Sequence, residues 1–330
     1  MKKLLGILSF ILVFGLAACS SSNTGGSIEN YPDKSIELTA AGSAGGGLDL
    51  MARSVDKGLK DAGLQDQPFV IKNNGGGGGN PARAYIAEQE GDPYYLLAES
   101  NRVYMNNIVG TTELGLDDVT PLARMATDYV AWVVRADSEY TDATQILNKL
   151  KEDPSSIQFG VGTVPSNDQM NIIRPAVEYG IDPNDVQIVA YDSGGTLMTQ
   201  LLGGHIEVIS TGVSEAIGQV EAGEARLLAI SAPEQVEGEF LSDVPTWKSM
   251  GIDVEILHWR GIFGPPNMPE EAIAYWDEKF GTLVETEEWQ AILDQNRWFD
   301  AYADSATFKS ELTEEWDIMA ELLKEIGLAE

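Results

Sequence analysis

Three glycine-rich segments hold the residue types and spacings that could bind a ligand. Gly42-Ser43-Ala44-Gly45-Gly46-Gly47-Leu48-Asp49 follows an expected strand and opens an expected helix. Residues 160–167 (Gly-Val-Gly-Thr-Val-Pro-Ser-Asn) repeat that design, and residues 191–196 (Tyr-Asp-Ser-Gly-Gly-Thr) form a third such loop. Loops of this kind direct free backbone N–H groups and the positive end of a helix toward an anion. Glycine can also serve only to permit a tight turn. Three loops with Ser, Thr and Asn between the glycines nevertheless favour a ligand held between two halves of the chain.

The sequence offers few groups for catalysis. It contains no Gly-x-Ser-x-Gly elbow, no His-Glu-x-x-His and no Cys-x-x-Cys. The first glycine loop is not a Walker A loop, because no Gly-Lys-Ser/Thr ends it, and its glycine spacing does not match a dinucleotide-binding loop. Of the two histidines, His205 is expected at a turn from a helix end into a strand, in a structural or exposed position, and the role of His258 is left open. We therefore expect no enzyme, no cofactor and no metal site. A secreted hydrolase using a pair of acids is the least favoured alternative.

The charge of the chain excludes two classes of partner. The 330 residues include 52 acidic and 21 basic side chains, for a formal net charge of −31. A field of that sign repels nucleic acids, and it also excludes a polybasic patch that grips anionic lipid headgroups. The length and the 43% hydrophobic content are those of a globular chain with room for two domains.

The N-terminus resembles a bacterial lipoprotein signal. Lys2 and Lys3 precede an uncharged stretch over residues 4–16, which ends in Leu-Ala-Ala-Cys at Cys19. We expect residues 1–18 to be a signal peptide, Cys19 to be lipidated and residues 19–30 to be a flexible tether. An ordinary secretory signal is the alternative. Cys19 is the only cysteine, so no disulfide can form within the chain.

Strand-like and helix-like segments alternate from Tyr31 onward, which is typical of parallel α/β sheets. Two α/β halves joined by short crossings fit the pattern better than one long linker does. We expect strands at 35–40, 69–71, 94–98, 129–134, 157–161, 186–190, 227–231 and 258–263. We expect helices at 48–60, 81–89, 143–151, 168–179 and 196–202, with acidic amphipathic helices after residue 263.

Several segments, taken in order, resemble the extracytoplasmic solute receptors of tripartite tricarboxylate transporters. The resemblance runs from about Tyr31 to Pro269, and the order and spacing of its motifs make it specific. The matching segments are Tyr-Pro-Asp-Lys-Ser-Ile at 31–36, Gly-Gly-Gly-Leu-Asp at 45–49 with Ala-Arg at 52–53, Asn73 with 76–80, Leu-Leu-Gly-Gly-His-Ile-Glu at 201–207, 222–229 and Asp-Val-Pro-Thr at 243–246.

The resemblance implies a two-lobed periplasmic-binding-protein fold of type II with two crossings between the lobes. Residues 31–128 and 230–330 would form lobe I, and residues 129–229 would form lobe II. Such a receptor would be a monomer on the outer face of the membrane, closing over a small organic acid and delivering it to the permease subunits. In that family the carboxylate is held largely by backbone amides, hydroxyls and waters rather than by an arginine. The matching positions here are Ser43, Gly45, Gly46, Gly47, Asp49, Gly162, Thr163, Ser166, Asn167, Tyr191, Ser193, Gly194 and Ser214.

Some positions depart from the family pattern. Ser43-Ala44 replaces common prolines, Gln169 replaces a common histidine, Asp192 replaces a common lysine, and Asp168 adds an acid. These changes favour a ligand with an amino group, or a metal-chelated acid, over a plain tricarboxylate. Asp168 could instead cap a helix while Asp192 faces solvent. Arg260 is a candidate carboxylate partner or, equally, an arginine at the core edge paired with an acid. A receptor for another transporter class also remains open.

Overall fold

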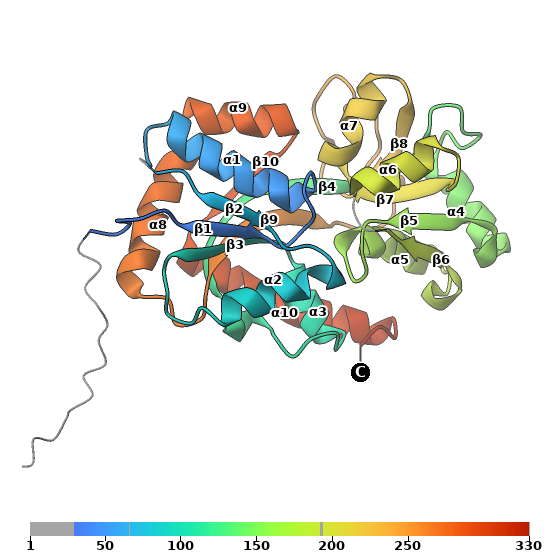
Figure 1. Cartoon of the computed structure of the whole chain (residues 1–330). Coiled ribbons are helices and arrows are strands. Elements are labelled where there is room, and N and C mark those ends of the chain that lie inside the picture. Colours follow the sequence, from blue (N-terminus) through green and yellow to red (C-terminus); the bar gives the residue numbers. More distant parts are fainter. Residues whose placement is uncertain (1–29, 66, 192–193, 330) are drawn as a thin grey trace, which may run out of the picture.

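The computed structural model describes residues 30–65, 67–191 and 194–329, which fold into two α/β lobes side by side (Figure 1). Ten strands of the described residues form one curled sheet in the order β2-β1-β3-β9-β4-β7-β5-β6, with β8 and β10 also paired to β4. The strands are β1 (Glu37–Ala40), β2 (Val70–Asn73), β3 (Tyr95–Glu99), β4 (Thr120–Arg135), β5 (Gln158–Val161), β6 (Gln187–Ala190), β7 (Val208–Gly212), β8 (Ala225–Ile230), β9 (Leu257–Gly264) and β10 (Phe299–Ala303).

The first lobe has helices on both faces of its part of the sheet. Figure 1 shows α1 and α9 above β1–β3, with α2, α3 and α10 below them. Strands β1, β2 and β3 are parallel, as strand–helix alternation predicts, whereas β9 is antiparallel to β3. The helices are α1 (Gly47–Asp61), α2 (Asn80–Ala87), α3 (Arg102–Ile108), α8 (Glu270–Val284), α9 (Glu287–Asn296) and α10 (Ser305–Glu325).

Strand β4 connects the two lobes. Its first part, up to Tyr129, pairs with β9, and its second part, from Val130, pairs with β7 and β8. Successive side chains of a strand point to opposite faces of the sheet. Accordingly, Trp132 joins one buried apolar cluster, while its neighbours Ala131 and Val133 join the other. The chain enters the second lobe along β4 and returns after β8, so the two expected crossings are present.

The second lobe is a smaller α/β unit. Helices α6 (Gly194–Leu202) and α7 (Val213–Glu221) pack on one face of β5–β8, and α4 (Ala143–Glu152) and α5 (Asn167–Glu178) pack on the other. Helix α4 begins with a capping box at Asp142, in which the side-chain oxygen accepts from the Thr144 N–H at 2.6 Å.

Within the described residues, no helix is long and apolar enough to span a bilayer.

The two-lobed α/β fold expected from the sequence is therefore confirmed, with local differences. Strand β4 begins at Thr120, nine residues before the predicted start at Tyr129. The sequence pattern did not predict its first part because the polar residues Arg124 and Asp128 interrupt the apolar run. Helices α3 and α7 and strand β10 were not expected. Strand β10 pairs with β4 over only a few residues, so it has little sequence signal of its own.

Candidate ligand-binding site

A cavity of about 580 Å³ lies between the two lobes. The carboxyl ends of three strands open into it, β1 and β3 from the first lobe and β5 from the second, since Ala41 follows β1, Ser100 follows β3 and Gly162 follows β5. Ligands of open α/β sheets bind outside the carboxyl ends of their strands. The cavity is therefore in the position that this architecture provides for a small molecule.

The first glycine loop gives the cavity an uncapped helix terminus. Helix α1 starts after Gly46, which offers no side chain to cap it, so the N–H groups of the first turn lack intrahelical partners. Gly46, Gly47 and Leu48 all line the cavity. Because the N-terminus of a helix also carries partial positive charge, this turn is suited to an anion.

Asp49 stabilises this loop from outside the cavity lining. Its carboxylate accepts from the Gly45 N–H at 2.9 Å and from the Asn73 side chain at 3.0 Å, and it pairs with Arg53 at 2.9 Å. Burial alone would raise the pKa of Asp49, but the hydrogen bonds from Arg53 and Gly45 outweigh it and hold the pKa below its usual value. Asp49 is thus an ionised group that shapes the loop.

The run of five glycines at residues 75–79 packs against the first glycine-rich loop, residues 42–49. A Cβ at Gly75 would lie only 2.7 Å from the Ser43 backbone nitrogen, so the two backbones approach too closely for a side chain at Gly75. Gly76, Gly77, Gly78 and Gly79 all have positive φ. Glycine is required here by close backbone approach and by conformation, and the run forms one wall of the cavity.

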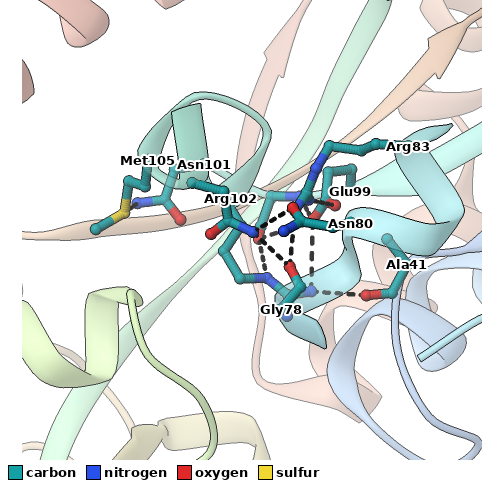
Figure 2. A network of polar contacts seen from close by, with 10 residues as sticks. Ala41, Gly78, Asn80, Arg83, Glu99, Asn101, Arg102 and Met105 are labelled. Carbon is teal, nitrogen blue, oxygen red and sulfur yellow. Dashed lines mark hydrogen bonds and ion pairs between the residues drawn. The ribbon is translucent and has the colours of Figure 1, made fainter. Parts of the chain in front are cut away.

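A buried ionic network holds this wall in place, as Figure 2 shows. The Arg83 guanidinium pairs with Glu99, and both side chains are buried. Arg83 also donates to the Gly78 carbonyl at 2.8 Å and to Asn80 at 2.5 Å. Burial lowers the pKa of Arg83, while the adjacent Glu99 carboxylate opposes that shift. The network fixes the glycine run relative to strand β3.

Arg102 extends the network to the cavity surface. Its Nη2 donates to the Ala41 carbonyl at 2.8 Å and lies 3.4 Å from Glu99. Its side chain is 14% exposed and lines the cavity. Its Nε and Nη2 donate within the protein, to Ser100, Ala41 and Glu99, so Nη1 is the nitrogen left to donate to a carboxylate in the cavity.

Two acids lie on the second-lobe wall. Asp168, in the first turn of α5, is 8% exposed, and its Oδ2 accepts from the Gly162 N–H at 3.3 Å. Glu215 in α7 accepts from the Thr211 hydroxyl at 2.6 Å. Burial, followed by the nearby Glu215 charge, raises the pKa of Asp168 to about 7. The alternative that Asp168 caps α5 is wrong, because the Ser166 hydroxyl caps that helix by accepting from the Gln169 N–H.

A third acid, Asp128, lies at the crossing between the lobes. It accepts from the Ser214 hydroxyl at 2.6 Å and lies 3.7 Å from Arg260, whose side chain is 3% exposed. Burial raises the pKa of Asp128 to about 6, although Arg260 and Ser214 counteract it. Arg260 lines the cavity and lies directly against Gly47. It is therefore an arginine paired with a buried acid, and it also borders the cavity.

The Asn167 side chain joins the two lobes. Its oxygen accepts from Asn101 at the start of α3, and its nitrogen donates to the Leu257 carbonyl at 2.9 Å. The same nitrogen lies 3.3 Å from His258 Nδ1. Burial and the nearby Arg260 charge lower the pKa of His258 well below its usual value, so this imidazole is neutral. Asn167 thus contributes to the cavity wall mainly by connecting its parts.

The structure brings together most of the residues expected from the sequence. Eight line the cavity, namely Ser43, Gly46, Gly47, Gly162, Thr163, Ser166, Asn167 and Tyr191. Gly45, Asp49 and Ser214 lie beside it, with Asp49 and Ser214 engaged in the contacts described above. Gly194 begins helix α6. Cys19, Asp192 and Ser193 lie outside the described residues.

Sequence reasoning missed several lining residues: Ser100, Asn101, Arg102, Glu215 and the glycine run 75–79 as a wall. Ser100-Asn101-Arg102 follows the expected strand 94–98 after one intervening residue, Glu99, so the rule that ligands bind at strand ends would have found it. Glu215 carries no comparable signal, because it is one acid among many. Among the described residues, no group of three or more His, Cys, Asp or Glu side chains is arranged to hold a metal ion.

Comparison with other sequences identifies relatives along most of the chain. The family model of the tripartite tricarboxylate transporter family receptor matches residues 51–328. The UPF0065 protein in the TAR-I ttuE-ttuC' intergenic region of Agrobacterium vitis is 25% identical over 250 residues, covering 73% of this chain and 68% of its own. Protein BugT of Bordetella pertussis is 23% identical over 271 residues, covering 80% and 79%.

Solved structures share the fold. Rpa4515 of R. palustris, solved with adipate, has a TM-score of 0.82 at 21% identity and covers 91% of this chain and 99% of its own. MatC from Rhodopseudomonas palustris, solved with bound malate, has a TM-score of 0.77 at 18% identity and covers 89% and 100%. These likenesses establish the two-lobed periplasmic-binding-protein fold. With the family model matched over most of its length, this chain belongs to the receptor family of the tripartite tricarboxylate transporters.

Proposed function

We propose that this protein captures a small carboxylate between its lobes and delivers it to the membrane permease of a tripartite transporter. The observation that supports this most directly is the uncapped N-terminus of α1, which opens into the cavity beside Arg102. The helix N-terminus and the Arg102 guanidinium both attract a carboxylate, and they act locally although the chain as a whole is acidic. Relatives of the same fold were solved with malate and adipate, which are carboxylates of suitable size.

In this proposal the carboxylate binds the N–H groups of Gly47 and Leu48, the Ser43 hydroxyl and the Arg102 guanidinium. The far end of the ligand lies against the second lobe, near Gly162, Thr163, Ser166 and Tyr191, all of which line the same cavity. Residues 31–128 and 230–330 act as one lobe and residues 129–229 as the other. Closure occurs about β4 and the return after β8, where the strand partners change. The receptor acts as a monomer and contributes binding alone, as expected of a receptor family.

Ligand binding should raise the melting temperature, because a ligand that binds only the folded state stabilises it. We expect at least one di- or tricarboxylate in a millimolar screen to do so. At a concentration 100 times its Kd, the free energy of unfolding should rise by about 2.7 kcal/mol. Differential scanning fluorimetry at constant ionic strength, with sodium chloride as the control, measures this. Shifts no larger than those of the salt control for every acid would refute carboxylate capture.

We further propose that Cys19 anchors the receptor to the outer face of the membrane. The motif that ends in Cys19 supports this, together with the extracytoplasmic role of the family. Replacing Cys19 by serine should remove the lipid attachment site and move the receptor from the membrane fraction to the soluble extracytoplasmic fraction. Immunoblots of fractionated cells measure this change, with Ser22→Ala as the matched control. A Cys19→Ser protein that stays in the membrane fraction would show that another group attaches it.

A further inference from the structure

The cavity carries charges of opposite sign on its two walls. Arg102 lines the first-lobe wall, next to the open turn of α1, and Asp168 and Glu215 line the second-lobe wall. Arg260 also lines the cavity but is paired with Asp128, at 3.7 Å. The cationic wall therefore faces an acidic wall whose charge is only partly balanced by neighbouring arginines.

The acidic wall has oxygen atoms that the protein does not use. Asp168 is more than nine-tenths buried, yet its one hydrogen bond among the described residues is the 3.3 Å contact from the Gly162 N–H to Oδ2. Glu215 Oε2 accepts from Thr211, and its other oxygen has no hydrogen-bond partner in the described part of the chain. Among the described residues, neither acid has an oxygen that is both fully buried and unpartnered, so the free oxygen of each is open to the cavity, where a ligand can donate to it. Both side chains line the cavity, so the missing donors can come from its contents.

We propose that the ligand carries a cationic nitrogen as well as a carboxylate, so that Asp168 and Glu215 bind the nitrogen while Arg102 and the α1 terminus bind the carboxylate. This inference rests on the proposed receptor function and specifies its substrate class as amino acids or similar zwitterions. An ammonium group offers three donors, enough to serve the unused oxygens of both acids. A plain dicarboxylate would instead place its second negative charge against them, and like charges at close range disfavour binding.

Protonation distinguishes these two ligand classes. The groups that act on Asp168 from other elements are Glu215, Arg260 and Arg102, together with the Gly162 N–H. With a pKa of about 7, Asp168 is largely protonated at pH 6.5 in the free protein. A cationic nitrogen beside it favours the carboxylate form, so binding should release a proton, and affinity should rise from pH 5.5 to 7.5. A second carboxylate at this wall favours the protonated form, which gives the opposite sign for both quantities.

Titration calorimetry on the full chain with matched ligand pairs tests the proposal. The pairs are succinate with aspartate, glutarate with glutamate, and adipate with 2-aminoadipate, each measured with EDTA at pH 6.5 in two buffers of different ionisation enthalpy. We expect at least one amino acid to bind ten-fold or more tightly than its partner acid, with net proton release. Asp168→Asn and Glu215→Gln should each reduce that preference to less than three-fold, and Asp168→Asn should abolish the proton release.

Controls and contrary outcomes separate this inference from the receptor function. Asp185→Asn and Glu224→Gln change exposed acids of the same lobe and should leave affinity and proton release unchanged. Circular dichroism and melting curves establish whether each variant is folded. Dicarboxylates that bind more tightly than every amino acid, or that bind with proton uptake, would be consistent with the proposed receptor function but would contradict a zwitterionic ligand. Dicarboxylate binding that requires added Ca²⁺ or Mg²⁺ would also overturn it, in favour of a metal-chelated acid. Binding of neither class at 10 mM would refute both proposals.

Discussion

Replacing Glu99 by glutamine should lower the free energy of unfolding by about 3–5 kcal/mol, because it leaves the Arg83 guanidinium buried without its counter-charge. Both side chains are almost entirely buried, at 2% and 0% exposed. The same carboxylate also accepts from the Ser100 N–H at 2.8 Å, so its loss weakens a second contact. Urea unfolding followed by tryptophan fluorescence measures the change, provided that the slope with denaturant stays constant.

Two further variants make this prediction sharper. Glu255→Gln makes the same substitution in the exposed pair with Lys248, whose side chains are each 37% exposed, and should cost less than about 1 kcal/mol. The double variant Arg83→Met with Glu99→Leu should regain part of the loss, since it removes both charges of the most deeply buried pair, although Arg102 still loses its contact with Glu99. Recovery should be incomplete, because Arg83 also holds the Gly78 carbonyl. A Glu99→Gln protein within about 1 kcal/mol of the original, or a double variant with simply additive losses, would contradict this account.

Replacing Arg102 by glutamine should weaken binding of the natural carboxylate by about 30- to 150-fold, equivalent to a loss of about 2–3 kcal/mol. The reason is that Arg102 presents a guanidinium fixed by the Ala41 carbonyl at 2.8 Å, and glutamine cannot replace its positive charge. Arg102→Lys keeps the charge alone and should give an intermediate loss. Calorimetry with the acid found in the thermal screen measures these affinities.

The stability of the unliganded variant distinguishes a ligand contact from a structural one. Glu99 retains Arg83 when Arg102 is changed, so Arg102→Gln should lower the free energy of unfolding by less than about 1.5 kcal/mol. Arg135→Gln removes an arginine of the second lobe that pairs with the exposed Asp137, and it should leave affinity unchanged. Affinity within three-fold of the original in Arg102→Gln would show that backbone amides bind the carboxylate without this arginine.

The glycine loops could be recognised from the sequence because their requirement is local. A glycine run after a strand and before a helix indicates an open helix terminus, whatever the remainder of the fold. Gly46, Gly47, Gly162 and Thr163 accordingly line the cavity. The alternation of strands and helices is also local, and it predicted most elements of both lobes. Only the order of the motifs along the chain, however, pointed to the family.

The roles of individual polar residues were not local. Ser214 is a predicted ligand contact, and in the structure its hydroxyl donates to Asp128, which lies 86 residues earlier in the chain. Asp49, another predicted ligand contact, accepts hydrogen bonds from Gly45 and Asn73 and pairs with Arg53. A single sequence does not distinguish an acid that stabilises a loop, such as Asp49, from one that lines a cavity, such as Asp168. Both are aspartates close to a glycine-rich loop.

The amino-acid sequence by itself therefore determined where backbone N–H groups are left open and that two α/β lobes enclose them. Only the tertiary structure decided which charges face the enclosed space. The antiparallel register of β4 with β9 places Asp128 beside His258 and two residues from Arg260, and α3, α5 and α7 bring Arg102, Asp168 and Glu215 to one cavity. The physical reason is that backbone conformation depends on neighbours in the chain, whereas the charge of a binding site depends on segments that meet only after the sheet has formed.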